Sequence, residues 1–398
     1  MDRRRFLQGL GAVSVLFPLN PIVAASPSFE DFKKQQNDGF SNYKAQLDRD
    51  FAAYKKAVAE EFDSYQGKVK KVWGDDNVGS PTVLVQYSDD LKSRTIIDYE
   101  KGAITVELVD DNAAKGVGTK LREAMLQIAD STVKEAYKND TLIQNIEKRV
   151  AKEITHQETA QVKNEPLISD VLTGIANPTK KQVVAVVNEA LKSAEGSTRS
   201  TPQSGKKVFA FSIPLNPTNI SKKSEQFKPL VLKYAAQEKI DPALVFAIMH
   251  SESAFNPMAK SHVPAYGLMQ IVPNSAGKDA SEKVYGKQRL LAPSYLYNSE
   301  NNIKMGCAYL NILYYRYLSK IENPESRTYC VIAAYNTGSG NVAKAFGAGT
   351  SVTKAAVTIN KMTPQQVYNK LVSSLPYAET KNYMKKVTPR YKAYQTEV

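Results

Sequence analysis

Residues 243–257 read Ala243-Leu-Val-Phe-Ala-Ile-Met-His-Ser-Glu-Ser-Ala-Phe-Asn-Pro257, an apolar run that predicts a helix with one carboxyl group near its end. The preceding Asp241-Pro242 is a strong start signal, because it supplies an N-cap oxygen and then a proline at the first helical position. Asn256-Pro257 ends the helix, because the residue before a proline is disfavoured in the helical conformation. Glu252 therefore lies in the last turn of the predicted helix.

The position of Glu252 predicts an acid that keeps its proton to unusually high pH. Leu244 and Ile248 fall at helical spacing from it, so its carboxyl group lies on or beside the apolar stripe. Burial there disfavours the charged form, and the negative end of the helix dipole acts in the same direction. Such an acid can break a glycosidic bond. On this helix alone, a solvated glutamate explains the pattern equally well.

Three further motifs follow the acid along the chain. They are Gly267-Leu-Met-Gln270, Ala334-Tyr-Asn336 and Ala378-Glu-Thr-Lys-Asn-Tyr383. Each is weak alone, but with Glu252-Ser-Ala-Phe-Asn-Pro257 they form an ordered set over about 130 residues. Together they resemble the lytic transglycosylases that have a goose-type-lysozyme-like catalytic domain.

The resemblance extends upstream of the acid and covers about four-fifths of the chain. Trp73-Gly74, Arg94-Thr-Ile-Ile-Asp98 and Gly102-Ala-Ile-Thr-Val-Glu107 resemble the N-terminal domain of the membrane-bound lytic murein transglycosylase C family. The substrate that this resemblance implies is the glycan of peptidoglycan, cut at the MurNAc-GlcNAc β-1,4 bond. The implied reaction is non-hydrolytic and leaves 1,6-anhydro-MurNAc ends.

The resemblance also implies that Glu252 acts first as acid and then as base. The substrate's own N-acetyl group would stabilise the anomeric centre, and its C6 hydroxyl would take the place of water. Tyr335 would hydrogen-bond the Glu252 carboxyl group and orient it, and Tyr383 would line the cleft beside the acid. Two rivals stay open: a lysozyme of similar fold that uses water, and a non-catalytic protein that binds the wall.

Four further residues are implied to bind the substrate. Gln270 and Asn336 would bind sugar hydroxyls or acetamido groups, and Ser261 would approach the N-acetyl group. Met269 would pack beneath a sugar ring, with plain core packing as an equal alternative. One departure bears on Ser261: the chain reads His262-Val-Pro-Ala-Tyr266, where relatives commonly have glycine or a small polar residue.

The sequence predicts neither a metal site nor a cofactor. His156, His250 and His262 are scattered, and no HExxH motif or paired CxxC motif is present. The two cysteines, Cys307 and Cys330, fall at positions too far apart along two antiparallel helices for a bridge. We therefore expect two buried free thiols.

Residues 1–25 predict an export signal. Arg3-Arg-Arg-Phe-Leu7 resembles a twin-arginine motif, and Val23-Ala-Ala25 supplies a cleavage site. Members of the resembled family carry a lipid on a cysteine just after the signal, whereas the first cysteine here is Cys307. The sequence therefore predicts a soluble periplasmic protein with no lipid anchor.

The chain is basic, which bears on its partners. Its net charge is +13, and it falls to +11 when the signal's three arginines and one aspartate are removed. This charge suits peptidoglycan, whose peptides carry carboxylates, and also favours weak contact with anionic membranes. Export argues against nucleic acid as the partner.

The expected fold class is α+β. A long amphipathic helix over 26–70 precedes a smaller α+β domain over 71–215, and a mainly helical, lysozyme-like catalytic domain covers 216–398. The smaller domain has four predicted strands that form an antiparallel sheet: Val83–Tyr87, Thr95–Asp98, Ile104–Leu108 and Val208–Ile213. Helical segments are predicted near 116–155 and 179–193, and a mobile loop over 193–205.

Overall fold

The computed structural model describes residues 29–110, 116–154, 157–192, 194, 196–201, 205–216 and 223–397, except for the side chains of 29–40 and 110. The predicted export signal over 1–25 lies outside these residues. The chain forms two compact units, one up to Gln46 and one from Leu47 onward. The predicted long helix is present as α1 (Phe29–Trp73) and runs through the boundary between the units.

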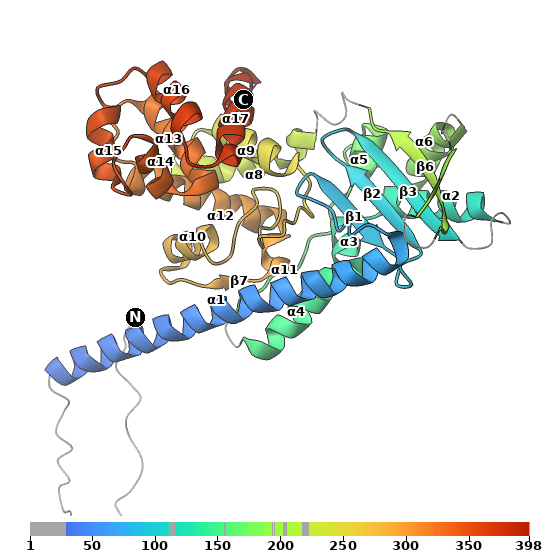
Figure 1. Ribbon diagram of the computed structural model, residues 1–398, viewed down its shortest axis with the longest axis horizontal. Helices are drawn as coiled ribbons and strands as arrows, with labels where there is room; N and C mark the ends of the chain where they lie inside the picture. The colour runs from blue at the N-terminus through green and yellow to red at the C-terminus, as the bar shows by residue number, and fades with distance from the viewer. Residues whose placement is uncertain are drawn as a thin grey trace, which may run out of the picture. The chain divides into compact units, whose positions relative to one another are not determined.

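The antiparallel sheet has five strands in the order β1-β2-β3-β6-β5 (Figure 1). The strands are β1 (Val83–Tyr87), β2 (Ser93–Asp98), β3 (Ala103–Asp110), β5 (Gly196–Ser200) and β6 (Lys207–Pro214). All four predicted strands are confirmed, and β6 returns beside β3 as expected. The apolar side chains of Ile104, Val106 and Ile213 are buried, so this sheet closes the core against the helices that follow it.

The loop predicted over 193–205 is wrong for its described part. Gly196–Ser200 form β5 and pair antiparallel with β6. The sequence Gly-Ser-Thr-Arg-Ser has no alternation of apolar and polar side chains that would mark a strand, and all five residues are exposed. The free edge of β6 supplies the backbone hydrogen bonds that make this segment a strand.

The predicted segment 116–155 holds three helices rather than one: α2 (Val117–Asp130), α3 (Val133–Asn139) and α4 (Thr141–Glu153). Side-chain caps cause the breaks. Thr132 accepts the backbone N–H of Glu135 in a capping box, and Asp140 accepts that of Ile143. The segment predicted at 179–193 is α6 (Lys180–Lys192), and the short α5 (Ser169–Thr173) was not predicted.

From residue 223 onward the described chain is mainly helical, as predicted. Its helices are α8 (Lys223–Glu238), α9 (Pro242–Ser253), α10 (Ala276–Tyr285), α11 (Pro293–Leu296), α12 (Ser299–Asn311), the π-helix η1 (Ile312–Tyr317), α13 (Pro324–Thr337), α14 (Ser339–Ala345), α15 (Val352–Ile359), α16 (Pro364–Ser374) and α17 (Ala378–Glu397). The two-residue strands β4 (Gln157–Glu158) and β7 (Leu290–Leu291) pair in parallel. The α+β fold class is thus confirmed.

Polar contacts join the sheet-bearing region to the helical region within the larger unit. The Tyr54 hydroxyl of α1 donates to the Tyr266 hydroxyl at 3.0 Å. The buried Lys260 ammonium pairs with the Asp140 carboxylate at 2.5 Å. A buried charge without its partner is costly, so this ion pair favours the arrangement in which the two regions are in contact here. The domain boundary predicted near residue 215 stays a prediction.

Cys307 and Cys330 are buried free thiols, as predicted. Burial raises the pKa of both thiols, which makes them poor nucleophiles. Among the helices that the structure describes, none combines the length and the apolar character that a bilayer crossing requires.

Candidate active site

The helix that carries Glu252 starts as the sequence predicts and ends two residues early. The Asp241 carboxylate caps α9 by accepting the Ala243 N–H at 2.9 Å. At the other end, Ala254 and Phe255 both adopt left-handed backbone conformations, with φ of 49° and 61°. Such angles are uncommon for residues with a side chain and persist where the surroundings enforce them, often at functional sites. They turn the chain sharply just after the acid.

Glu252 is partly buried at the end of α9 and is held by a residue of α17. The Tyr383 hydroxyl donates a hydrogen bond of 2.6 Å to Glu252 Oε1. Burial raises the pKa of Glu252 to about 7, although the Tyr383 hydrogen bond and the Lys386 charge lower it and the Glu379 charge raises it further. Burial is the leading cause, which agrees with the sequence prediction. At neutral pH, a large fraction of this carboxyl group holds its proton.

The predicted hydrogen bond from Tyr335 to Glu252 is wrong. The Tyr335 hydroxyl donates to the backbone carbonyl of Met269 at 2.8 Å, so its single proton is not available for the acid. Burial and then the charge of Glu252 raise the pKa of Tyr335. The orienting donor is therefore Tyr383, and Tyr335 holds the Gly267–Gln270 loop instead.

Two buried side chains fix the Gly267–Gln270 loop. The Ser253 hydroxyl, next to the acid in sequence, donates to the Leu268 carbonyl at 2.8 Å. Asn302 of α12 accepts the Met269 N–H and donates to the Tyr266 and Leu296 carbonyls, all at 2.8 Å. Gly267 has φ of 73°, and a Cβ there would collide with the Asn302 amide and the Leu296 carbonyl. Glycine is required because the backbone passes so close to α12.

Met269 packs in the core rather than on an open surface. Its side chain is fully buried, and a Cβ added to Gly306 of α12 would collide with its sulfur. The role beneath a sugar ring is therefore wrong for this structure, and the alternative of core packing is correct. Met269 still matters to the site, because its backbone carries the bonds to Asn302 and Tyr335.

The structure places Gln270 and Asn336 with their amides already oriented. Gln270 has a left-handed backbone with φ of 48°, and its amide nitrogen donates to the Gly267 carbonyl at 3.0 Å. Its amide oxygen is buried and has no hydrogen-bond partner within the described parts of the chain. Asn336 accepts a hydrogen bond of 2.7 Å from Thr380, one turn before Tyr383 on α17.

Ser261 lies in a narrow loop, between the bridged residues Lys260 and Tyr266. Its hydroxyl donates to the Val263 carbonyl in the same loop. The chain's unusual His262-Val-Pro-Ala stretch therefore provides the partner of this hydroxyl. The predicted approach of Ser261 to an N-acetyl group stays a prediction.

Sequence reasoning missed Asn302, Thr380 and Lys386, which support the site from α12 and α17. No pattern marks Asn302 and Lys386, because each is a single polar residue in a helix with no motif around it. Only Thr380 lies inside a quoted motif, the one that ends at Tyr383. Burial of a fully satisfied asparagine such as Asn302 becomes visible only when the loop it holds is in place.

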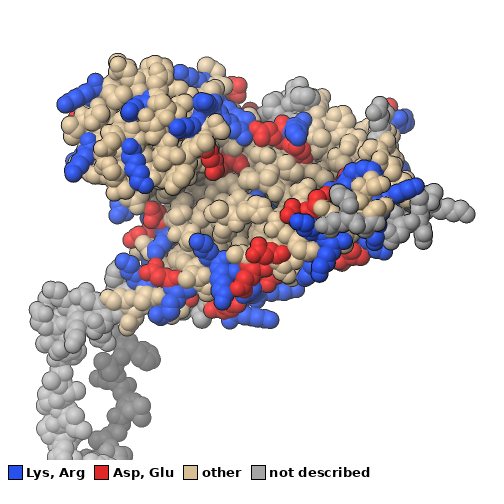
Figure 2. Space-filling view, in the orientation of Figure 1, with Lys and Arg blue, Asp and Glu red and all other residues tan. Residues whose placement is uncertain are grey.

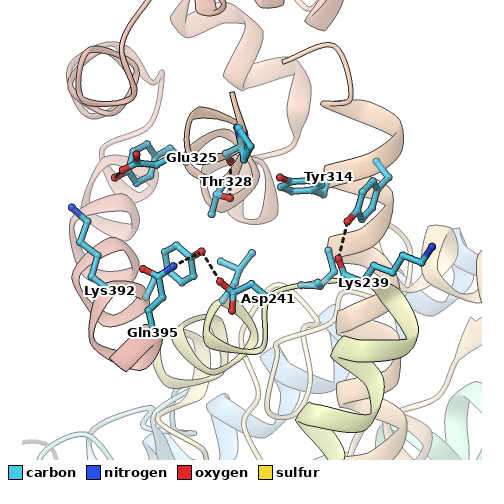
Figure 3. A pocket seen from close by; sticks show the side chains of 13 residues that line it. Lys239, Asp241, Tyr314, Glu325, Thr328, Lys392 and Gln395 are labelled. Atoms are coloured by element: carbon cyan, nitrogen blue, oxygen red, sulfur yellow. Dashed lines mark hydrogen bonds between the residues drawn. The ribbon is translucent and has the colours of Figure 1, made fainter. Parts of the chain in front are cut away.

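A cavity of about 620 Å³ lies at the start of α9, away from the acid (Figure 3). Asp241 lines it and stands eleven positions before Glu252, about 16 Å along the helix axis. Its polar groups bind one another: Tyr391 donates to Asp241 at 2.7 Å, and Tyr315 donates to the Lys239 carbonyl at 2.8 Å (Figure 3). This cavity takes no part in the site around Glu252.

Comparison with known proteins finds matches to both regions of the chain. The family model for the transglycosylase SLT domain matches residues 229–357, and the model for the N-terminal domain of membrane-bound lytic murein transglycosylase C matches residues 51–201. The membrane-bound lytic murein transglycosylase C of Klebsiella pneumoniae (strain 342) is 31% identical over 329 residues, which cover 82% of this chain and 86% of that protein. The protein of the same description from Sodalis glossinidius (strain morsitans) is 33% identical over 331 residues, 82% of this chain and 87% of that protein.

Among solved structures, the 70 kDa soluble lytic transglycosylase from Escherichia coli is 28% identical. It aligns with 44% of this chain and 25% of its own, with a TM-score of 0.32. The two relatives and the two family models cover both the sheet-bearing and the helical regions. The chain belongs to the membrane-bound lytic murein transglycosylase C family.

Proposed function

We propose that this protein is a peptidoglycan lytic transglycosylase that cleaves the MurNAc-GlcNAc β-1,4 bond without water. The observation that carries the proposal is the Glu252 carboxyl group, partly buried, held by Tyr383 and with its pKa raised to about 7 by burial. A general acid works best when its pKa lies near the working pH. Sacculi incubated with the protein should lose turbidity and release soluble muropeptides; binding without release would favour a scaffolding role.

The reaction needs one acid that becomes a base. Glu252 donates its proton to the glycosidic oxygen as the bond from that oxygen to C1 breaks, and the substrate's N-acetyl oxygen stabilises C1. The Glu252 carboxylate then removes the proton of the C6 hydroxyl, whose oxygen bonds to C1 and closes the anhydro ring. The hydroxyl is already part of the substrate, so proximity replaces the water that a second carboxylate would otherwise position.

Two carboxylates that follow the acid in sequence are bound to other residues, which supports a single-acid mechanism. Asp279 accepts a hydrogen bond from Tyr317 at 2.9 Å. Hydrogen bonds from Lys163 and Lys233 lower the pKa of Glu300 to about 2, so it stays an anion bound to lysines. Glu379 is the carboxylate whose charge acts on Glu252, and it is exposed in the first turn of α17.

Substrate contacts are proposed for Gln270, Asn336 and Ser261. The unpartnered, buried amide oxygen of Gln270 supports this role, because a buried acceptor without a donor is costly until a ligand supplies one. Thr380 holds the Asn336 amide oxygen, which leaves its amide nitrogen to face a sugar or acetamido oxygen. Ser261 would need to release the Val263 carbonyl to reach an N-acetyl group.

Substitution of Tyr383 by phenylalanine should raise the pKa of Glu252 above about 7, because the lost hydrogen bond stabilises the carboxylate. The basic limb of the pH–rate profile should move to higher pH, and the rate should fall about tenfold as the acid loses its orientation. Tyr335→Phe is the matched control. It breaks a bond to the Met269 carbonyl, so it should not move the basic limb upward. A basic limb that stays in place in Tyr383→Phe would contradict the assignment.

The surface of residues 326–378, which we call the cationic lobe, supports an anionic partner. It contains no aspartate or glutamate. Its exposed lysines Lys344, Lys354, Lys361 and Lys370 form no ion pair within the described residues, and Figure 2 shows Lys and Arg side chains spread over this part of the molecule. We propose that the lobe attracts the peptide carboxylates of murein, with weak contact to anionic membranes as a lesser effect.

Replacing the four lysines of the cationic lobe by glutamine should weaken binding to purified sacculi about tenfold at low salt, and added salt should erase the difference. A variant with Lys134, Lys138, Lys152 and Lys181 replaced is the matched control, since these lysines are also exposed. Equal losses in both variants would show a response to net charge alone. A loss of binding to anionic vesicles but not to sacculi would instead favour the membrane.

Export to the periplasm is proposed from the arginine-led segment at residues 1–25. Fractionation of cells that produce the full chain should place the protein in the periplasmic fraction. If the twin-arginine pattern is the export signal, replacement of Arg3, Arg4 and Arg5 by lysine should keep the protein in the cytoplasm.

A further inference from the structure

The exposed carboxylate of Glu100 links the sheet-bearing region to α17, the helix whose Tyr383 binds the Glu252 carboxyl group. Glu100 lies in the turn between β2 and β3. Its Oε1 pairs with the Lys386 ammonium of α17 at 2.9 Å and with the Arg390 guanidinium at 3.5 Å. The hydrogen bond from Lys386, its charge and that of Arg390 outweigh burial and lower the pKa of Glu100, so it remains an anion.

The two cations of this cluster also act on the end of α9. Lys386 is one turn beyond Tyr383 on α17, and its charge acts on Glu252. Arg390 donates to the His250 carbonyl at 3.0 Å and to the Ser251 hydroxyl at 3.2 Å, in the last turn of α9. The turn that bears Glu100 is thus linked through α17 to the backbone just before Glu252.

Among the charged groups that act on Glu252, Lys386 is the one that favours the carboxylate over the protonated acid. From α17 it meets the neutral Tyr383, the cation Lys386 and the anion Glu379; from α13 it meets the neutral Tyr335. Burial, and then Arg390 and Lys386, lower the pKa of His250 to about 4, so this neighbour on α9 carries no charge at neutral pH. The local balance therefore depends on what neutralises Lys386.

We propose that Glu100 is a positioning residue for Glu252: by pairing with Lys386 it offsets the charge of that lysine and helps the acid to keep its proton. The inference deepens the proposed function, on which it rests, and gives the sheet-bearing region a part in the chemistry. The pairs are partly exposed, so the effect is expected to be small but measurable.

The test is a titration of Glu252 in the full chain by carbon NMR of protein labelled at glutamate carboxyls, with Glu252→Gln to assign the signal. Glu100→Gln should lower the pKa of Glu252 by about half a unit, because Lys386 then acts unopposed. Lys386→Gln should raise it by a similar amount, and the double variant should return near the parent value. Glu100→Asp keeps the negative charge, so the pKa of Glu252 in this variant should stay close to the parent value.

Glu189→Gln is the matched control, since it breaks an exposed salt bridge of 2.6 Å with Lys192 on α6 and should leave the pKa of Glu252 unchanged. An unmoved Glu252 titration in both Glu100→Gln and Lys386→Gln would overturn the proposal; if Glu100→Gln does not fold, Lys386→Gln decides alone. The titration needs no substrate, so it also separates the two proposals. Shifts in the expected directions in a protein that does not cut murein would sink the proposed function and leave this inference standing.

Discussion

Replacement of Glu252 by glutamine should lower the rate of murein cleavage about 10²- to 10⁴-fold, the range that a general acid contributes. Glutamine has nearly the same shape but carries no acidic proton, so the fold and the affinity for sacculi should persist. The rate of the parent protein should also fall as the pH rises through about 7, because the acid form of Glu252 is then lost. Clearing of sacculi and a binding assay on the same preparations measure both effects.

Glu379→Gln is the matched control for this prediction. Glu379 is the carboxylate whose charge acts on Glu252, and a two-carboxylate hydrolase would use it as nucleophile or base. In the single-acid mechanism its loss should change the rate only about threefold, through a small downward shift in the pKa of Glu252. Full activity in Glu252→Gln, or losses of equal size in both variants, would contradict the assignment.

Substitution of Asn302 by alanine should destabilise the protein by about 3–5 kcal/mol, since it leaves buried backbone groups without partners. Those groups are the Met269 N–H and the Tyr266 and Leu296 carbonyls, each bonded to Asn302 at 2.8 Å. The loop that they hold carries Gln270, so activity should fall as well. Urea unfolding measured by circular dichroism gives the change in free energy.

The neighbouring Asn301→Ala is the matched control, because the Asn301 side chain is partly exposed and contributes only its backbone N–H to the cap at Asn298. It should change the free energy of unfolding by less than about 0.5 kcal/mol. A loss below about 1 kcal/mol in Asn302→Ala would show that the Gly267–Gln270 loop does not depend on this residue.

The sequence was sufficient for the features that local patterns encode. The cap at Asp241 and the apolar run after it predict α9, and the β-rich runs predict four of the five strands in the sheet. The raised pKa of Glu252 also follows from its place on an apolar helix, because burial is its leading cause.

Features that depend on contacts between segments distant in the chain could not be predicted from the sequence. Tyr335 was predicted to orient the acid and Tyr383 only to line the cleft, and the packing of α13 and α17 is what makes Tyr383 donate to Glu252 and Tyr335 to Met269. The burial of Met269 depends on the absence of a side chain at Gly306, which is far away in sequence. The strand β5 has no apolar alternation and exists because β6 offers a free edge.

Digestion of purified sacculi in water enriched in ¹⁸O tests the central claim, that a single acid cleaves murein without water. If the Glu252 carboxylate removes the proton of the C6 hydroxyl, the anhydro ring forms without water. The muropeptides should then be lighter by one water than those of a lysozyme digest, and their MurNAc ends should contain no ¹⁸O. Reducing ends that carry ¹⁸O would show that water attacks the anomeric carbon and would contradict the account.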